Sequence, residues 1–415
     1  MLHWLASIPF CRRISVLFTV CTIFVILPFT TAIAGGLYLN EFGTSSMGTA
    51  GAGANAYAND ASTAFHNPAG MTRIDGNQFA AAAGLIYADV KFNPDADTPI
   101  PGGDGGSAGG FAPLVGSHYV HSVSDNFKLG MNVVAISGAA LDYDNDWAGR
   151  YLGQEITLMT ISLVPGIGYR ISDKFSVGGG LTITYGNLDL EAAIPNPLGP
   201  EHPDGKVKVE DADDWEVGFQ LGVLFELSED TRIGAIYFSG IEPDFSSDAD
   251  IKPVGLEAGI HLKIDFPEMV RGSIYHKLNE KFALLGTLGW EKWSDLDKIP
   301  ISTGGGSAAI PTNWDDVWHF AGGIHYIPND KWMFMTGVAY DTSPAEKKYG
   351  NPLLPVDRQI RLALGTQYHW KENVDIGAAF VYADLGESEI QSDKLIGDYE
   401  DNRAVMFGFN FNWKL

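Results

Sequence analysis

The chain has 415 residues, of which 45% are hydrophobic and 19% are charged, and it contains 49 Gly, 23 Phe, 16 Tyr and 10 Trp. Soluble domains carry about 25% charged residues, and the abundance of aromatic residues argues against a disordered chain. The net charge of −24 argues against nucleic acid or an anionic membrane surface as a partner, because both require a basic surface. No linker-like stretch divides the chain, so we expect one large closed structure.

The N-terminus has the organisation of a secretory signal peptide. Arg12 and Arg13 precede an apolar run, Ile14–Phe29, and the small residues of Thr31–Ala34 follow it. A basic region, a short apolar core and an A-x-A-like end are typical of such a peptide, and the run is shorter than the roughly 20 residues of a membrane-spanning helix. We predict that residues 1–34 are removed, with a retained anchor as the alternative. Both cysteines lie in this segment, so the mature chain is expected to have no disulfide.

The next segment, residues 35–76, differs from the rest of the chain. It is small and weakly polar, and Gly43–Ala54 shows no period of two. Two roles fit this composition, an internal plug of a wide barrel or a disordered periplasmic tail. The plug is favoured if the remaining chain forms more than about eight barrel strands, because side chains alone do not fill so wide a lumen.

From about Asn77 onwards, apolar and polar residues alternate. The final segment shows this best, with one face formed by Val405, Phe407, Phe409, Phe411, Trp413 and Leu415. The intervening residues are mostly small or polar. Such alternation indicates strands with a different environment on each face, either in a soluble sandwich or in a membrane barrel with lipid outside and a polar lumen.

Short polar turns distinguish these two folds. Six tripeptides have an acidic residue at their centre: Ser124–Asn126, Ser172–Lys174, Ser228–Asp230, Asn279–Lys281, Asn329–Lys331 and Lys371–Asn373. They recur roughly every 50 residues, whereas turns in a sandwich recur every 8–12 residues. Outer-membrane barrels have short periplasmic turns and long external loops. Six turns, with both chain ends on the turn side, predict an all-β fold, a 14-stranded antiparallel transmembrane β-barrel over residues 77–415, with residues 35–76 as its N-terminal hatch.

The stretches between these turns contain the predicted external loops. Most of them are acidic or rich in Pro and Gly, and they are Asn93–Ala112, Asp142–Gln154, Pro195–Asp214, Glu242–Glu257, Ile299–Trp314, Thr342–Asp357 and Gly386–Asn402. Two strands are irregular in the sequence. Pro165 removes a hydrogen-bond donor in mid-strand, which predicts a bulge or distortion, and Phe282–Trp290 does not alternate clearly enough to assign its faces.

Several motifs resemble the FadL/TodX-type outer-membrane transporters of long-chain fatty acids and aromatic hydrocarbons. The motifs are Gly35–Gly43, Met47–Ala50, Asn59–Ser62, Asn67–Ala69, Trp147–Tyr151, Phe266–Met269 and Trp290–Ser294. Together they span essentially the whole mature chain. The combination is specific, although Asn-Pro-Ala alone would carry little weight.

The resemblance implies a 14-stranded barrel closed by an N-terminal hatch. It also implies that external loops capture a hydrophobic ligand, that the extreme N-terminus contacts it at an interior site, and that it leaves sideways at a kink in the third strand, Phe127–Tyr143. Carried over by position, the residues expected to bind ligand are Gly35, Gly36, Leu37 and Phe42, and those expected in the hatch or gate are Asn67, Pro68, Ala69, Ser137 and Gly138. Glycine suits a bent strand.

The chain departs from the fatty acid members of this family at the interior site. Those members use basic residues to bind the carboxylate, whereas the corresponding stretches here, Asn187–Glu191 and Trp314–Trp318, are acidic. The remaining basic candidates in the lumen are Arg361, which we take as a ligand-binding residue, and Arg271. Long-chain fatty acids and neutral aromatic or aliphatic hydrocarbons therefore both stay open as substrates.

The sequence does not favour an enzyme. Gly105-x-Ser107-x-Gly109 matches the spacing of a nucleophile elbow but lies in a Gly-rich loop rather than between a strand and a helix. His118 and His121 are three apart on a strand, which places them on opposite faces. His319 and His325 share a face but are too far apart to act together, and polar lining of the lumen explains them. No cofactor is predicted.

We therefore expect passive uptake of hydrophobic compounds across the outer membrane of a Gram-negative bacterium, with a general hydrophilic porin as the alternative. The expected partners are hydrophobic small molecules, outer-membrane lipid and lipopolysaccharide. The final strand, ending at Phe411–Leu415, is expected to engage the outer-membrane assembly machinery. A monomer is expected, and nucleic acid is not.

Overall fold

The computed structural model describes residues 44–196, 198–199, 202–345, 350–400 and 402–415. The predicted signal peptide and the first residues of the predicted hatch lie outside this part, so the cleavage site stays a prediction. Within it, no helix is long and apolar enough to cross a bilayer.

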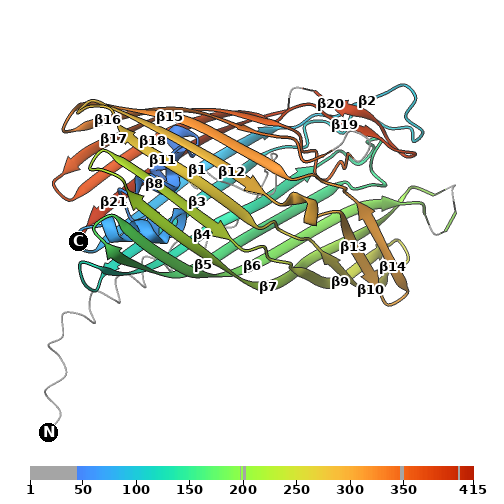
Figure 1. Cartoon of the computed structure of the whole chain (residues 1–415). Helices are drawn as coiled ribbons and strands as arrows, with labels where there is room; N and C mark the ends of the chain where they lie inside the picture. Colours follow the sequence, from blue (N-terminus) through green and yellow to red (C-terminus); the bar gives the residue numbers. More distant parts are fainter. Residues whose placement is uncertain (1–43, 197, 200–201, 346–349, 401) are drawn as a thin grey trace, which may run out of the picture. The chain divides into compact units, whose positions relative to one another are not determined.

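The wall is a closed antiparallel barrel of 14 strands, which confirms the predicted fold class (Figure 1). The strands are β1 (Gln78–Asp89), β3 (Phe111–Ser122), β4 (Phe127–Asp142), β5 (Glu155–Ser172), β6 (Phe175–Ile194), β7 (Gly205–Glu226), β8 (Thr231–Phe238), β11 (Met269–Lys277), β12 (Phe282–Glu291), β15 (Val317–Asn329), β16 (Trp332–Asp341), β17 (Gln359–Lys371), β18 (Val374–Asp384) and β21 (Arg403–Lys414). Pairing of β1 with both β3 and β21 closes the ring. Closure satisfies the backbone of every strand edge, which a bilayer requires.

All six acidic tripeptides form the short turns that the sequence predicts, joining β3 to β4, β5 to β6, β7 to β8, β11 to β12, β15 to β16 and β17 to β18. The predicted external loops are only partly correct, because four of them contain additional strands and a fifth contains the start of β7. The hairpins β9–β10 (Asp244–Lys252, Leu256–Lys263) and β13–β14 (Lys298–Thr303, Gly306–Pro311) extend the wall outwards. A separate three-stranded sheet joins β2 (Asn93–Pro94), β20 (Ile396–Tyr399) and β19 (Ser388–Gln391).

Most of β9 is polar on both faces, and its large apolar residues are Phe245, which is buried, and Ile251 near its end. A strand beyond the bilayer needs no apolar outer face, so β9 lacks the alternation on which the prediction rests. The strand β10 does alternate, but only its first two residues lie inside the predicted loop Glu242–Glu257. The β7 strand is also longer than predicted. It begins at Gly205, inside the predicted loop Pro195–Asp214.

The outer face of the wall is apolar and the inner face is small or polar. In β21, Phe407, Phe409 and Trp413 are exposed outwards, whereas Ala404 and Asn412 are buried inside. The strand β12, left unassigned from the sequence, alternates regularly in burial. Its pattern was hidden by an inward leucine that packs on the hatch.

Pro165 interrupts the ladder as predicted, although without a bulge. Between β5 and β6 the pairs Leu163–Ile183 and Gly166–Gly180 are in the same register, and Val164 and Pro165 make no pair with β6.

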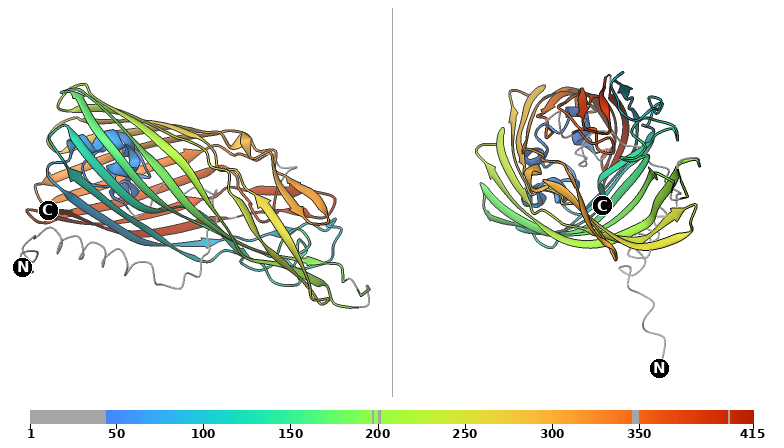
Figure 2. Two further views of the ribbon diagram at one scale, coloured as in Figure 1. Left: turned by 90° about the horizontal axis from the view of Figure 1, so that it is seen from below. Right: turned by 90° about the vertical axis from the view of Figure 1, so that its right-hand side faces the viewer.

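The N-terminal segment from Thr44 to Ile74 lies inside the ring of strands, near the end that carries the short turns (Figure 2, right). It folds as four short helices, η1 (Ser45–Thr49), α2 (Ala54–Tyr57), α3 (Thr63–His66) and η2 (Pro68–Arg73). Its position is consistent with the predicted hatch, and we call it the hatch. The remaining helix of the described part, η3 (Trp293–Asp295), follows β12.

Glycines of the wall allow the hatch backbone to approach closely. A Cβ on Gly337 would lie 2.1 Å from the carbonyl oxygen of Thr49, and one on Gly234 would lie 1.9 Å from that of Asn55. The helices η1 and α2 therefore contact the wall through their main chains.

This packing predicts that Gly337→Ala displaces η1 without preventing barrel assembly. The added methyl group overpacks the contact between η1 and the wall, which costs about 1–3 kcal/mol of local stability. Hydrogen exchange of residues 45–52 should be faster in this variant. Gly322→Ala is the matched control, because a Cβ there meets nothing within 4 Å. Equal hydrogen exchange of residues 45–52 in the two variants would show that this close contact does not hold the hatch.

Candidate functional site

Three features of the lumen bear on function: the anchoring of the hatch, a break in the wall, and a pocket on the external side of the hatch. Four of the predicted ligand-binding residues, Gly35, Gly36, Leu37 and Phe42, lie outside the described residues. Their role stays a prediction.

The predicted Asn67-Pro68-Ala69 motif anchors the hatch to the wall. The Asn67 side chain is fully buried, and its Nδ2 donates to the carbonyl oxygens of Asn55 at 2.7 Å and Val223 at 3.0 Å. Its Oδ1 accepts from the Ala69 backbone N–H at 3.1 Å, which caps η2. Pro68 suits the first helical position because it has no N–H to satisfy. One side chain therefore joins two hatch helices to β7.

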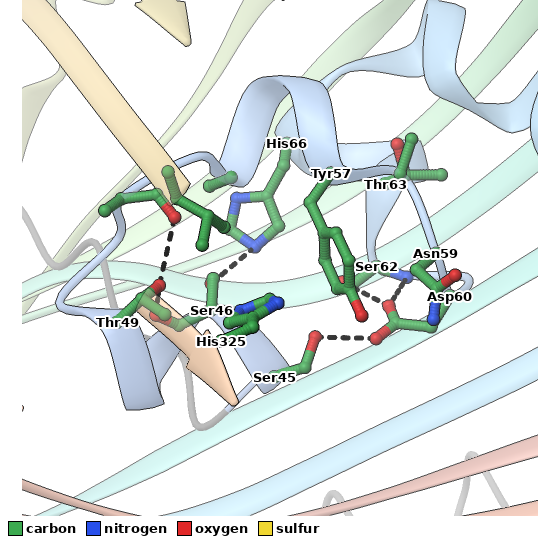
Figure 3. Close-up of a pocket in the computed structure, with 14 residues that line it drawn as sticks. Ser45, Ser46, Thr49, Tyr57, Asn59, Asp60, Ser62, Thr63, His66 and His325 are labelled. Carbon is green, nitrogen blue, oxygen red and sulfur yellow. Dashed lines mark hydrogen bonds between the residues drawn. The ribbon is translucent and has the colours of Figure 1, made fainter. Parts of the chain in front are cut away.

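A small polar cavity lies within the hatch and against the wall (Figure 3). Asp60 forms its polar centre: its Oδ2 accepts from the Ser45 hydroxyl at 2.7 Å, and its Oδ1 accepts from the Ser62 backbone N–H at 2.9 Å. His66, on α3, and His325, on β15, lie on the other side of the cavity. Burial, and then the nearby His118, lower the pKa of His66 to about 3.

The third barrel strand, β4, is irregular where the resemblance places a kink. Its register with β5 shifts between Val134 and Ser137, so that β4 contains one extra residue. Its ladder with β3 ends at the pair Gly116–Val134. Farther out, the Asp142 backbone N–H at the end of β4 donates to the carbonyl of Ala108, in the loop before β3, at 2.9 Å. We call this interruption, from Gly116–Val134 to Ala108–Asp142, the β3–β4 break.

The buried residues on both sides of the β3–β4 break are apolar. Leu114 on β3 and Ala139 and Leu141 on β4 are all nearly inaccessible. The predicted gating residues Ser137 and Gly138 lie on β4 within the break, directly after the extra residue. An interrupted ladder leaves backbone groups without strand partners, which is costly in a membrane unless protein covers them. The apolar side chains on both sides of the β3–β4 break limit the polar surface that the interrupted ladder exposes.

A row of side chains crosses the wall on the external side of the hatch. Arg271, Gly289, His319 and Asp341 are directly opposite one another on β11, β12, β15 and β16. The predicted ligand-binding residue Arg361 stands on the next strand, β17, and its guanidinium pairs with the Asp341 carboxylate. The structure thus brings both basic lumen candidates of the sequence to one region of the wall.

Each of these cations has an acidic partner. The Arg271 Nη2 lies 2.6 Å from a Glu291 oxygen, and Asp341 also binds the His319 Nδ1 at 2.6 Å in addition to Arg361. Arg361, His319, Asp341 and Glu291 are all buried. Buried charges are stable only when paired, so the basic groups here are already neutralised within the wall.

A pocket lies beside this network, and part of its wall is aromatic. The Trp293 and Trp314 rings pack edge to face at 5.3 Å, and the Trp293 Nε1–H donates to Glu291 at 2.9 Å. Val317 and Val356 add apolar surface, whereas Asp341 and Arg361 form polar parts of the lining. The indole of Trp293 therefore connects the apolar and charged parts of the pocket.

The sequence comparison places two acidic stretches at the interior site, where fatty acid transporters have basic residues. The structure does not turn the acids of these stretches into the lumen. In Asn187–Glu191 the inward residue is Leu188, which is fully buried, and Asp189 and Glu191 belong to the other face of β6. In Trp314–Trp318 the buried residues are Trp314 and Val317. The alternation of inward and outward side chains along β6 could have shown this for Asn187–Glu191. The acids that do face the lumen, Glu291 and Asp341, were not selected from the sequence, although Glu291 lies in the Trp290–Ser294 motif.

The buried state of His66 predicts a pH-dependent hatch. The folded state keeps this imidazole neutral down to about pH 3, whereas an unfolded chain binds the proton below about pH 6.5. The unfolded hatch therefore binds more protons, and its stability falls as the pH drops from 6.5 towards 3, by at most about 1.4 kcal/mol per pH unit. The protection factors of residues 44–74, which correct for the slower intrinsic exchange of amides in acid, should fall over this range. His66→Gln should flatten the profile, and an unchanged profile in that variant would refute the assignment.

The family model for outer membrane protein transport protein (OMPP1/FadL/TodX) matches residues 25–414. The long-chain fatty acid transport protein of Escherichia coli O6:H1 is 27% identical over 427 residues, covering 92% of this chain and 95% of that protein. Outer membrane protein P1 of Haemophilus influenzae is 26% identical over 445 residues, with the same coverage.

Solved structures share the fold. The crystal structure of a Pseudomonas aeruginosa FadL homologue superposes with a TM-score of 0.83 at 22% identity, covering 92% of this chain and all of that one. The Ralstonia pickettii toluene transporter TbuX gives a TM-score of 0.70 at 19% identity, covering 89% of this chain and 97% of that one. The chain belongs to the OMPP1/FadL/TodX family of outer-membrane transport proteins and is not an enzyme.

Proposed function

We propose that this protein mediates the passive uptake of hydrophobic compounds, which enter from the external loops and leave sideways through the β3–β4 break into the outer membrane. The observation that carries the proposal is the break itself. Gly116–Val134 is the last pair of the β3–β4 ladder, and the border beyond it is apolar. A hydrophilic porin needs no such border, because its solutes pass along the lumen.

The hatch blocks the axial route in this proposal. It fills the lumen near the periplasmic turns and is held by main-chain contacts on glycines and by Asn67. An apolar solute that reaches the pocket beside Arg361 then has hydrocarbon as its favourable destination, since transfer from water to an apolar phase gains about 25 cal/mol per Å². No energy source is required for this direction of transport. Movement of the hatch when ligand arrives is part of the proposal.

The charge pattern of the pocket supports a neutral substrate or a neutral part of a substrate. The relatives are named for long-chain fatty acid and toluene transport, so both classes are available to this family. Here Arg361 is paired with Asp341, and Arg271 is paired with Glu291. A fatty acid carboxylate would have to displace one of these acids from its arginine, whereas a hydrocarbon would only have to fill the space beside Trp293 and Trp314.

Removing the extra residue of β4 tests the lateral exit. Deletion of Ala135 leaves the residues beyond the bulge on their present faces and lets β4 continue its ladder in regular register. Uptake of toluene and oleate by cells that lack their own hydrophobic transporter should then fall at least tenfold, while barrel assembly persists. A small sugar serves as the hydrophilic control. Unchanged toluene and oleate uptake would exclude the β3–β4 break as the exit, and sugar permeation alone would indicate a porin.

Neutralising Asp341 tests the substrate class. In Asp341→Asn the Arg361 guanidinium loses the Asp341 carboxylate, which removes one negative charge from the buried network and makes binding of an anionic ligand more favourable. Oleate should bind more tightly to the purified variant than to the wild type, by about tenfold or more. Oleate methyl ester is the matched control ligand, because it has no charge and should gain nothing. Equal gains for the acid and the ester would show that charge pairing does not select the substrate.

A further inference from the structure

A second row of polar side chains crosses the wall at the level of the hatch. Asn412 on β21, Ala80 on β1, His118 on β3 and Asn132 on β4 stand directly opposite one another. All four are buried on the inner face. Neighbouring strands are about 4.8 Å apart, so the small side chain of Ala80 leaves a space between His118 and Asn412.

The state of His118 is fixed by its neighbour. The Asn132 Nδ2 donates to the Val164 carbonyl at 3.0 Å, which leaves the Asn132 Oδ1 as an acceptor. That oxygen lies 2.9 Å from the His118 Nδ1, so the proton is on Nδ1. The His118 Nε2 is therefore an unprotonated acceptor. It is buried and has no hydrogen-bond partner.

A carboxylate from the hatch faces the same space. Asp60 lines a cavity together with His118, Asn412 and Ala80. Among the described residues no basic side chain lies within 4.0 Å of Asp60, and its bonds come from Ser45 and Ser62. The side-chain oxygen of Asn412 is also buried without a partner. Three acceptors thus surround one space, and the single formal charge among them is negative.

We propose that this cavity binds one divalent metal ion, with the Asp60 carboxylate, the His118 Nε2 and the Asn412 Oδ1 as its protein ligands. Buried charges in proteins are either paired with an opposite charge or bound to a metal. Among the described residues Asp60 has no oppositely charged partner. The cavity has room for about one water-sized atom. The Asp60 carboxylate and the His118 imidazole make no contact of 4.0 Å or less, whereas two ligands of one tetrahedral zinc ion lie about 3.3 Å apart. Binding therefore has to draw the hatch carboxylate towards β3.

The donor set indicates the class of metal. Imidazole suits zinc and the other later first-row metals, whereas calcium and magnesium prefer oxygen alone. Two oxygens and one imidazole nitrogen therefore favour zinc over the alkaline-earth ions, with the fourth position left to water. The Asn132 contact holds the imidazole in the required tautomer, as hydrogen-bonded partners of metal-binding histidines do.

The site lies where the hatch meets the wall beside the β3–β4 break. His118 is two residues from Gly116, the last β3 residue paired with β4 before the β3–β4 break. Asp60 and Ser45 belong to the hatch, whereas His118 and Asn412 belong to the wall. A bound metal would fasten the hatch to β3 and β21 directly beside the break, so metal loading would make hatch opening less frequent.

Metal binding by the purified protein tests this proposal independently of transport. The full chain in detergent is stripped with a chelator, titrated with zinc chloride and assayed for retained zinc. One equivalent should bind, and Asp60→Asn and His118→Gln should each weaken binding more than about tenfold, since even outer-shell changes cost 10–100-fold. His325→Gln is the matched control, because His325 is an equally buried histidine that does not line this cavity. Retention of zinc should be unaffected in that variant.

Hydrogen exchange of residues 44–62 gives a second measurement. Zinc should slow exchange in the wild type and in His325→Gln but not in His118→Gln. If Asp60→Asn does not assemble, Ala80→Leu fills the floor of the cavity without removing a ligand and should also abolish binding. The proposal is overturned if no equivalent of zinc is retained, if His118→Gln binds zinc as the wild type does, or if equimolar calcium displaces it.

Discussion

The requirement that every lipid-facing backbone group be hydrogen-bonded governs this structure. It explains why the wall closes through the pairing of β1 with β21. The β3–β4 break matters because it departs from this rule over several residues of the wall. The β3–β4 ladder ends at Gly116–Val134, β4 has an extra residue relative to β5 directly after this pair, and the Asp142 N–H bonds to Ala108 in the loop before β3. The break is therefore bounded at both ends, which keeps the barrel closed around it.

The hatch satisfies a different requirement, since it lies inside a wide lumen. Its contacts with the wall combine close main-chain approaches on glycine, polar bonds such as those of Asn67 and of Ser273 with Asn55, and apolar clusters such as Ala52 and Ala56 with Leu285. The apolar clusters resist separation, because separating them would expose apolar surface to water. Polar bonds can be exchanged for bonds to water at small net cost. The composition of residues 44–74, rich in Ala, Gly, Ser and Thr, follows from this arrangement.

Much of the fold could be predicted from local sequence patterns. Acidic tripeptides mark all six turns, because two strands must end there, and alternation identifies strands wherever lipid contacts one face. Beyond the bilayer that signal weakens, which is why β9, β13 and β14 were taken for loops. The candidate site was predicted less completely. Parity placed Arg361 in the lumen, but its pairing with Asp341 depends on the register of β16 with β17, which no local pattern contains. The protonation state of the His118 Nε2 depends in the same way on Asn132, which lies on the neighbouring strand β4.

The pairing of the lumen arginines also bears on how one family serves chemically different substrates. A guanidinium on the lumen wall binds a carboxylate whether that group belongs to a ligand or to the protein. When the partner is supplied by the protein, as Asp341 is for Arg361, the pocket keeps its polar network and the arginine already has a carboxylate bound to it. Its selectivity then rests on the aromatic surface of Trp293 and Trp314. A change at a single acidic position, rather than a rebuilt pocket, would therefore be enough to move a barrel of this kind between anionic and neutral hydrophobic ligands.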